Sequence, residues 1–106
     1  MTNHVRMGIY SITQGTYDEL VEKARQGLAP IHRDSPGFIF YSVSDVGDGR
    51  FVSVSTWESR EQAEAATAKS AEWVSENLAD SVALQENLIG EMTTLAARVE
   101  RRAVVR

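Results

Sequence analysis

The sequence has no cysteine and only two histidines, and these absences exclude several kinds of site. Without cysteine, neither a disulfide framework nor a thiolate metal site can form. His4 and His32 are the only histidines, so a histidine-rich metal centre is not expected either. We therefore predict that the protein has no metal site.

Long apolar segments are also missing. No apolar run approaches the ~20 residues that a helix needs to cross a bilayer. The amino-terminal stretch alternates polar and apolar residues and lacks the apolar block of a secretory signal. We expect a cytoplasmic protein with no membrane partner.

The body of the chain has little positive charge. The formal net charge is −4, and residues 95–106 hold four arginines against one glutamate, a net +3 that leaves −7 on residues 1–94. Binding to nucleic acid requires a basic face, so we do not expect a nucleic-acid partner. The charge divides the chain into one domain, 1–94, and a basic C-terminal tail, 95–106. The tail fits either a short helix or a loose arm.

The first half of the domain reads as a strand followed by a helix. Apolar and other residues alternate from residue 5 to residue 13, so the strand has two distinct faces. Thr16 precedes Glu19 by three residues, the spacing of a capping box at a helix start. One apolar stripe then continues to Ile31, and Pro30 is expected to kink the last turn.

The second half repeats this order. Residues 38–46 and 50–57 are rich in aromatic and β-branched residues, and the glycines of Gly47-Asp48-Gly49 suit a tight hairpin between them. Ser59 and Gln62 form a second capping-box pattern before an alanine-rich helix that ends near Leu78. A last strand is expected at about 82–92.

The order β-α-β-β-α-β predicts an α+β, ferredoxin-like fold, with a four-stranded antiparallel sheet and two helices on one face. Both faces of the predicted strands carry apolar residues: Val52 and Val54 alternate with Phe51 and Trp57. Two helices cover only one face, so the other must be buried elsewhere. We predict a homodimer in which two sheets pack face to face.

Three short stretches resemble the antibiotic biosynthesis monooxygenase family. They are Pro36-Gly37-Phe38, the glycine hairpin, and Trp57-Glu58-Ser59 at the start of the second helix. The resemblance covers residues 4–93 and implies a dimeric α+β barrel. It also implies oxidation of aromatic phenols by oxygen without a metal or organic cofactor, with the substrate supplying the carbanion that reacts.

The resemblance carries over to few functional residues. The family's tryptophan at the end of the third strand falls on Trp57 and is retained. Its asparagine, tyrosine and arginine fall on Ser53, Glu64 and Val74.

The heme-degrading members match less well. Their polar and aromatic positions fall on Gly8, Thr67 and Asn77, so no histidine is available as an axial ligand. Heme degradation is therefore not expected.

We predict a site on the helix-facing side of the sheet. Trp57 is the candidate catalytic residue, although it could simply close the core. Hydroxyl, amide and aromatic groups are the candidate substrate-binding residues, and each could instead serve packing or helix ends: Ser53, Trp73, Tyr41, Asn77 and Tyr10.

Two functions remain open. The first is a cofactor-independent monooxygenase for a small aromatic or quinone-like molecule. The second is a non-catalytic homodimer of the same fold that binds a small ligand or is purely structural. His32, at the end of the first helix, is expected to be a cation favoured by the helix dipole, with proton transfer as the alternative.

Overall fold

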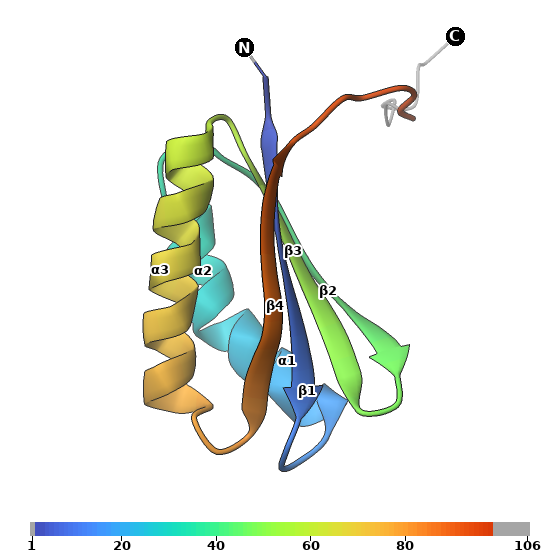
Figure 1. Ribbon diagram of the computed structural model, residues 1–106. Helices are drawn as coiled ribbons and strands as arrows, with labels where there is room; N and C mark the ends of the chain where they lie inside the picture. The colour runs from blue at the N-terminus through green and yellow to red at the C-terminus, as the bar shows by residue number, and fades with distance from the viewer. Residues whose placement is uncertain (1, 99–106) are drawn as a thin grey trace, which may run out of the picture.

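The computed structural model describes residues 2–98. Its helices and strands, in chain order, are β1 (His4–Ile12), α1 (Tyr17–Gln26), α2 (Leu28–Arg33), β2 (Phe38–Gly47), β3 (Arg50–Trp57), α3 (Arg60–Asn77) and β4 (Val82–Glu91). The strands form one antiparallel sheet in the order β2-β3-β1-β4. The helices lie on one side of it (Figure 1). This arrangement confirms the predicted ferredoxin-like fold.

The first helical region differs from its prediction, because it consists of two helices and not one kinked helix. The capping box at its start is present: Thr16 Oγ1 accepts a hydrogen bond from the Glu19 N–H, and Glu19 Oε1 accepts one from the Thr16 N–H. The break falls at Gly27, where a Cβ atom would lie 2.5 Å from Trp73 Nε1. Pro30 lies in the first turn of α2, where no intrahelical partner is needed for its missing N–H.

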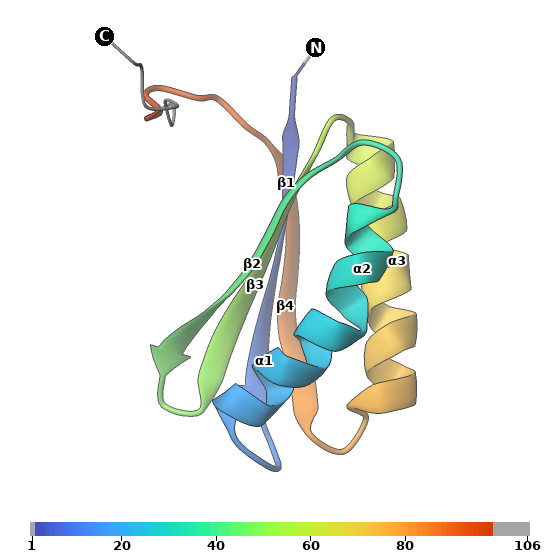
Figure 2. The ribbon, with the colours of Figure 1, turned by 180° about the vertical axis from the view of Figure 1, so that it is seen from behind.

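The break turns the chain between α1 and α2, and Figure 2 shows the two helices following different directions across the sheet. At this break, the indole of Trp73 occupies the space that a side chain at residue 27 would need. The close approach of this indole explains why residue 27 is a glycine.

The hairpin between β2 and β3 is confirmed. Gly47, Asp48 and Gly49 have φ angles of 85°, 56° and 70°, all in the region that glycine enters most readily. Asp45 stabilises the turn, because its Oδ1 accepts a hydrogen bond from the Gly47 N–H at 3.0 Å.

The second capping box is only half formed. Ser59 Oγ accepts a hydrogen bond from the Gln62 N–H at 3.2 Å, as predicted, but Gln62 does not return the contact. Its side chain instead packs against Gly37, whose φ is 78° and whose missing Cβ leaves the space that the Gln62 amide fills.

Two clusters of buried side chains lie between the sheet and the helices. The larger contains Tyr10, Leu20, Leu28, Phe51, Trp73, Leu78 and Val82. The smaller contains Trp57, Ala63 and Ala66, with Phe38 and Ile89 packed against it. The alanines of α3 allow this helix to approach β3 closely enough to enclose the Trp57 indole completely.

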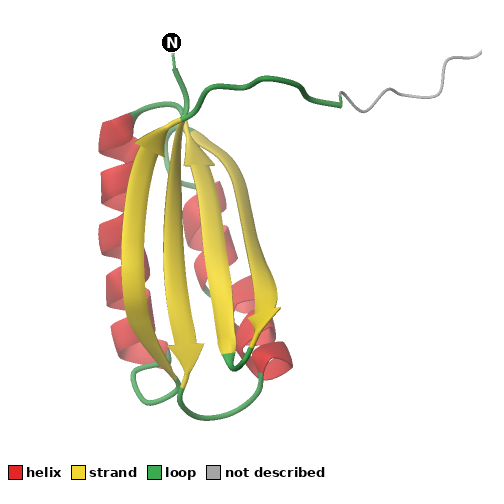
Figure 3. Ribbon diagram, turned by 45° about the vertical axis from the view of Figure 1, so that its right-hand side comes forward, coloured by secondary structure: helices red, strands yellow, loops and turns green. Residues whose placement is uncertain are grey.

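The opposite face of the sheet has no covering helix, as Figure 3 shows. We call it the open face, and define it by Val5, Met7, Ile9, Phe40, Val52, Val54 and Leu88. Met7 pairs with Val54 on one side and Leu88 on the other, which gives an apolar row across three strands. Met7, Phe40 and Leu88 are 37%, 53% and 45% exposed. The prediction of a second apolar face is confirmed.

After β4, residues 92–98 form neither helix nor strand, and Leu95 is 90% exposed. The remainder of the predicted basic tail, residues 99–106, lies outside the described residues. Within residues 2–98, no helix has the length and apolar character needed to cross a membrane.

The capping box at α1 provides a first prediction. Thr16→Ala should lower the free energy of unfolding by about 1 kcal/mol, because it leaves the Glu19 N–H without its acceptor. Thr16→Asp, which supplies another good N-cap acceptor, should retain most of the stability. Urea denaturation of the three proteins measures the difference, and equal stability of Thr16→Ala and wild type would contradict the assignment.

Candidate functional site

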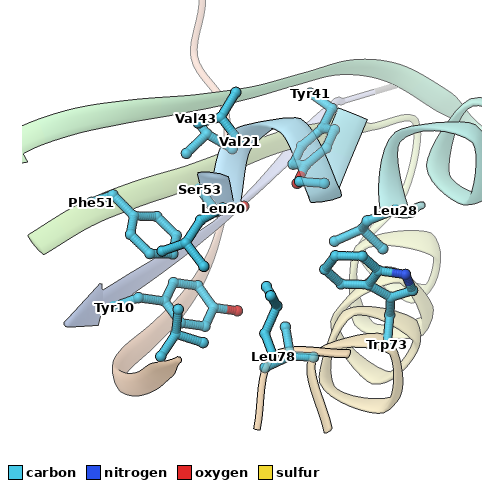
Figure 4. Close-up of a pocket in the computed structure, with 13 residues that line it drawn as sticks. Tyr10, Leu20, Val21, Leu28, Tyr41, Val43, Phe51, Ser53, Trp73 and Leu78 are labelled. Atoms are coloured by element: carbon cyan, nitrogen blue, oxygen red, sulfur yellow. The ribbon is translucent and has the colours of Figure 1, made fainter. Parts of the chain in front are cut away.

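A small cavity lies in the larger core, between the sheet and the helices. We call it the inner cavity; its volume is about 30 Å³, room for one or two water molecules. Its walls are mostly apolar, with a few hydroxyl groups and the Trp73 indole (Figure 4). They are formed by Tyr10, Leu20, Val21, Ala24, Leu28, Tyr41, Val43, Phe51, Ser53, Trp73, Val74, Leu78 and Val82.

Four of the six predicted site residues meet at this cavity. Tyr10 comes from β1, Tyr41 from β2, Ser53 from β3 and Trp73 from α3. The fold brings them together because the strand residues share the helix-facing side of three neighbouring strands. Figure 4 shows the Tyr10 and Tyr41 hydroxyl groups directed into the same space, with the Trp73 ring across from them.

The other two predicted residues do not line the inner cavity. Trp57 is 0% exposed, and its Nε1–H donates a hydrogen bond to Ser55 Oγ at 2.9 Å. Asn77 lies in the last turn of α3, where its Nδ2 donates to the Trp73 carbonyl at 2.9 Å. Trp57 and Asn77 can therefore affect the cavity only through other residues that line it.

Tyr41 is a neutral hydrogen-bonding group at neutral pH. Burial raises the pKa of its phenol to about 12, although a hydrogen bond with Ser53 and the positive charge of Arg6 oppose the increase. Tyr41 can therefore donate its proton in a hydrogen bond, while Ser53 can donate or accept.

The sequence reasoning did not single out Arg6, whose side chain is central to the polar part of this region. Arg6 is 2% exposed. Its Nε donates to Asn87 Oδ1 at 2.6 Å, and its Nη2 donates to the Tyr10 hydroxyl at 3.1 Å. The side chain crosses Gly8, where a Cβ atom would lie 2.8 Å from Nη2. The sequence does contain a signal for Arg6: it shares every second position of β1 with Gly8 and Tyr10, so all three positions lie on one face of the sheet.

His32 is buried and neutral, so the expectation of a cation favoured by the helix dipole is wrong. It is 1% exposed, and its ring lies edge-on to Tyr41 and Trp57, with centroid distances of 4.8 and 5.4 Å. Burial, followed by the charges of Arg6 and Lys69, lowers its pKa to about 4. The α2 helix turns this residue toward the sheet, and desolvation outweighs the helix dipole there.

His32 also contacts Ser70, with 3.2 Å between Nε2 and the Ser70 oxygen. Neither residue lines the inner cavity, so this pair does not place a nucleophile beside a bound ligand. His32 instead connects the two aromatic groups, since it touches Tyr41 at the cavity and Trp57 in the smaller core.

A surface groove of about 250 Å³ lies between α1 and β2 and borders the inner cavity. The two share Val21, Ala24, Tyr41 and Val43. These four side chains separate the inner cavity from the groove, and we call them the partition. A second groove, of about 220 Å³, lies beside Trp57 and the start of α3, but it shares no lining residue with the inner cavity.

The described residues contain no group of three or more histidine, aspartate or glutamate side chains placed to hold a metal ion. The inner cavity instead combines flat apolar walls with hydroxyl groups. Such a surface can bind a planar ring and orient its polar substituents.

Comparison with known proteins identifies the family. The sequence profile described as "Antibiotic biosynthesis monooxygenase" matches residues 4–73, about two thirds of the chain. The chain belongs to the antibiotic biosynthesis monooxygenase family. No curated protein sequence matches it.

Several solved structures share the fold at low sequence identity. SnoaB of Streptomyces nogalater, described as a cofactor-independent oxygenase, has a TM-score of 0.70 at 16% identity, covering 92% of this chain and 100% of SnoaB. A protein of unknown function from Nitrosomonas europaea has a TM-score of 0.69 at 17% identity, covering 95% of this chain and 97% of its own. MupZ of Pseudomonas fluorescens has 0.68 at 13%, covering 84% and 71%. At these identities the likeness shows the fold alone.

The buried neutral state of His32 predicts a pH dependence of stability. Its pKa is about 4 in the folded protein and 6.5 when unperturbed. The contribution of His32 to the free energy of unfolding is complete above pH 6.5. It is lost as the pH falls toward 4, because only the unfolded chain binds the proton in that range. The total loss should be about 3 kcal/mol.

Urea denaturation between pH 7 and pH 4 measures this loss. Carboxylates titrate over the same range, so the quantity to compare is the difference between wild type and His32→Gln. The variant should show the shallower pH dependence. Parallel curves for the two proteins would contradict a buried neutral imidazole.

Proposed function

We propose that the protein is a cofactor-independent monooxygenase that oxidises a small aromatic or quinone-like molecule in the inner cavity. The observation that carries the proposal is the convergence of Tyr10, Tyr41, Ser53 and Trp73 on one cavity. Membership of the antibiotic biosynthesis monooxygenase family supports the same reaction class. The fold itself hosts many functions, so these residues have to supply the specificity.

In the proposed reaction the substrate supplies the electrons. A phenolic substrate with an acidic CH₂ group loses a proton to solvent, and the resulting carbanion attacks O₂ to form a C–O bond and a peroxide anion, which takes a proton back from solvent. The hydroperoxide then loses water, so that CH₂ and O₂ yield C=O and H₂O. The protein's contribution is to bind the ring, orient its oxygen atoms and exclude bulk water.

The proposed roles follow from position. Trp73 and the aromatic wall hold the planar ring, while Tyr41, Ser53 and Tyr10 bind its oxygen atoms. We assign Trp57 a positioning role, since it reaches the cavity through His32, which packs against Tyr41. Asn77 similarly supports the Trp73 backbone.

A substrate of this kind is larger than the space available, so binding requires the partition to open. The groove between α1 and β2 provides the route, because it is separated from the inner cavity only by side chains that border both. Displacement of Val21 and Ala24 with α1 would merge the two spaces. Together their volume would be about 280 Å³, close to the lower end of the range usual for small-ligand sites.

The second candidate function is a non-catalytic homodimer of the same fold. Two observations favour it: the inner cavity is only about 30 Å³, and the one retained family aromatic residue, Trp57, is completely enclosed. In that case the hydroxyl groups would bind water or a small ligand without turnover.

Oxygen consumption with a panel of hydroquinones and anthrones tests the enzymatic proposal. Tyr41→Phe and Ser53→Ala should each lower kcat/KM about fivefold, the effect of losing one neutral hydrogen bond to the substrate. Tyr17→Phe is the matched control, because the Tyr17 hydroxyl donates to the Val43 carbonyl and does not line the cavity.

Wild-type oxygen uptake no faster than in protein-free buffer would contradict the enzymatic proposal. Quenching of tryptophan fluorescence by the same compounds would then support the ligand-binding alternative.

We further propose that two copies associate through the open face. Each large apolar side chain that moves from water into a core contributes about 1.5–3 kcal/mol, and Met7, Phe40 and Leu88 are all substantially exposed on this face. A second copy presents the same apolar rows, and a twofold arrangement closes the contact without leaving an apolar edge for further copies.

Sedimentation analysis tests the association. The wild type should have about twice the chain mass of 11.7 kDa, and Met7→Lys should shift it to the monomer because it places a charge in the centre of the interface. Ile31→Lys, at an exposed apolar residue of α2, is the matched control and should remain dimeric. A wild-type monomer at micromolar concentration would overturn the proposal.

A further inference from the structure

The most unusual charged group in the protein is Arg6. An arginine is protonated at every physiological pH, and burial of its charge is costly unless an anion compensates it. Arg6 is 2% exposed, yet within residues 2–98 its hydrogen-bond partners are neutral and it takes part in no salt bridge. The layer between the sheet and the helices therefore carries an uncompensated positive charge.

The groups near Arg6 do not neutralise its positive charge. The charge of Arg6 acts on His32, which is a neutral ring because burial, followed by Arg6, keeps its pKa low. The same charge acts on Tyr41, which is a neutral phenol. Asn87, Tyr10 and Tyr41 supply dipoles but no negative charge.

The charge is directed toward the inner cavity through Tyr10. Arg6 Nη2 donates to the Tyr10 oxygen at 3.1 Å, so the phenol's own hydrogen remains free to point elsewhere. Figure 4 shows this hydroxyl directed into the cavity. A phenol that accepts a bond from a cation becomes a stronger donor itself. An oxygen of a ligand in the cavity would meet this polarised hydroxyl.

Gly8 makes the arrangement possible. A Cβ atom at residue 8 would lie 2.8 Å from Arg6 Nη2 and 2.8 Å from Tyr10 Cε1. Any other residue at this position would push the guanidinium away from the phenol. The order Arg-x-Gly-x-Tyr on the helix-facing side of β1 thus builds a charged donor pair in a core that is otherwise apolar.

We propose that the inner cavity is an oxyanion site for small aromatic anions, in which Tyr10 donates to a carboxylate or phenolate oxygen and Arg6, behind it, supplies the compensating positive charge. Arg6 is a positioning residue, since it acts through Tyr10. This inference deepens the proposed function, on which it rests for the location of the ligand, by naming the charge of the molecule that binds.

Two probes test the charge preference without any turnover. Benzoate and benzamide have the same shape and differ in charge, so calorimetry should show tighter binding of benzoate by wild type. 4-Nitrophenol reports its own ionisation by visible absorbance, and binding should lower its pKa. The first probe represents carboxylates and the second represents phenolates.

Arg6→Met should reduce benzoate affinity about tenfold, leave benzamide unchanged and abolish the 4-nitrophenol shift. Gly8→Ala keeps the charge but displaces the guanidinium, and it should weaken the preference in the same direction. Arg33→Met, at an exposed arginine of α2, is the matched control and should behave as wild type.

The Tm of the ligand-free protein distinguishes this role from a structural one. Arg6→Met should keep or raise the Tm, because a methionine removes an uncompensated buried charge. A lower Tm together with unchanged benzoate selectivity would overturn the proposal. These results do not depend on oxygen uptake, so a protein that selects anions but consumes no oxygen would overturn the monooxygenase assignment alone.

Discussion

The structure depends on the fact that a four-stranded sheet has two faces, whereas the helices cover only one. The covered face encloses both buried clusters, the inner cavity and the charged pair of Arg6 and Tyr10. The open face carries apolar side chains that no other part of residues 2–98 covers. Strand alternation therefore divides the residues of β1 between the two faces: Met7 lies on the open face, and Arg6, Gly8 and Tyr10 lie on the covered face.

On the covered face, packing and chemistry use the same residues. The Trp73 indole packs against Gly27, where α1 ends, and forms one wall of the cavity. His32 is turned inward by the short α2 helix and links Tyr41 to Trp57. The chain retains few of the residues expected from its family, yet these contacts leave a mostly apolar cavity with aromatic walls and a few hydroxyl groups between the sheet and the helices.

Local sequence signals predicted the elements and the fold, because each depends on neighbouring residues. Thr16 and Ser59 marked helix starts, and Gly47 and Gly49 marked the hairpin. Tyr10, Tyr41 and Ser53 were candidates because of their hydroxyl groups, and the structure brings all three to the inner cavity on the covered face. The family resemblance was less informative about position: it indicated Trp57 as the candidate catalytic residue, but the Trp57 indole lies in a cluster separate from the inner cavity.

The sequence by itself determined the order of strands and helices, the two-faced sheet and the family. The elements and the two faces of the sheet follow from periodicity, caps and turns, which act over a few residues, whereas the family follows from the sequence profile that matches residues 4–73. Only the tertiary structure decided that the Trp73 indole packs against Gly27, that His32 is neutral, and that Arg6 is buried with no carboxylate partner among residues 2–98. Each of these depends on side chains from distant parts of the chain, Trp73, Trp57 and Asn87 among them. Desolvation and close contact arise only when those parts come together.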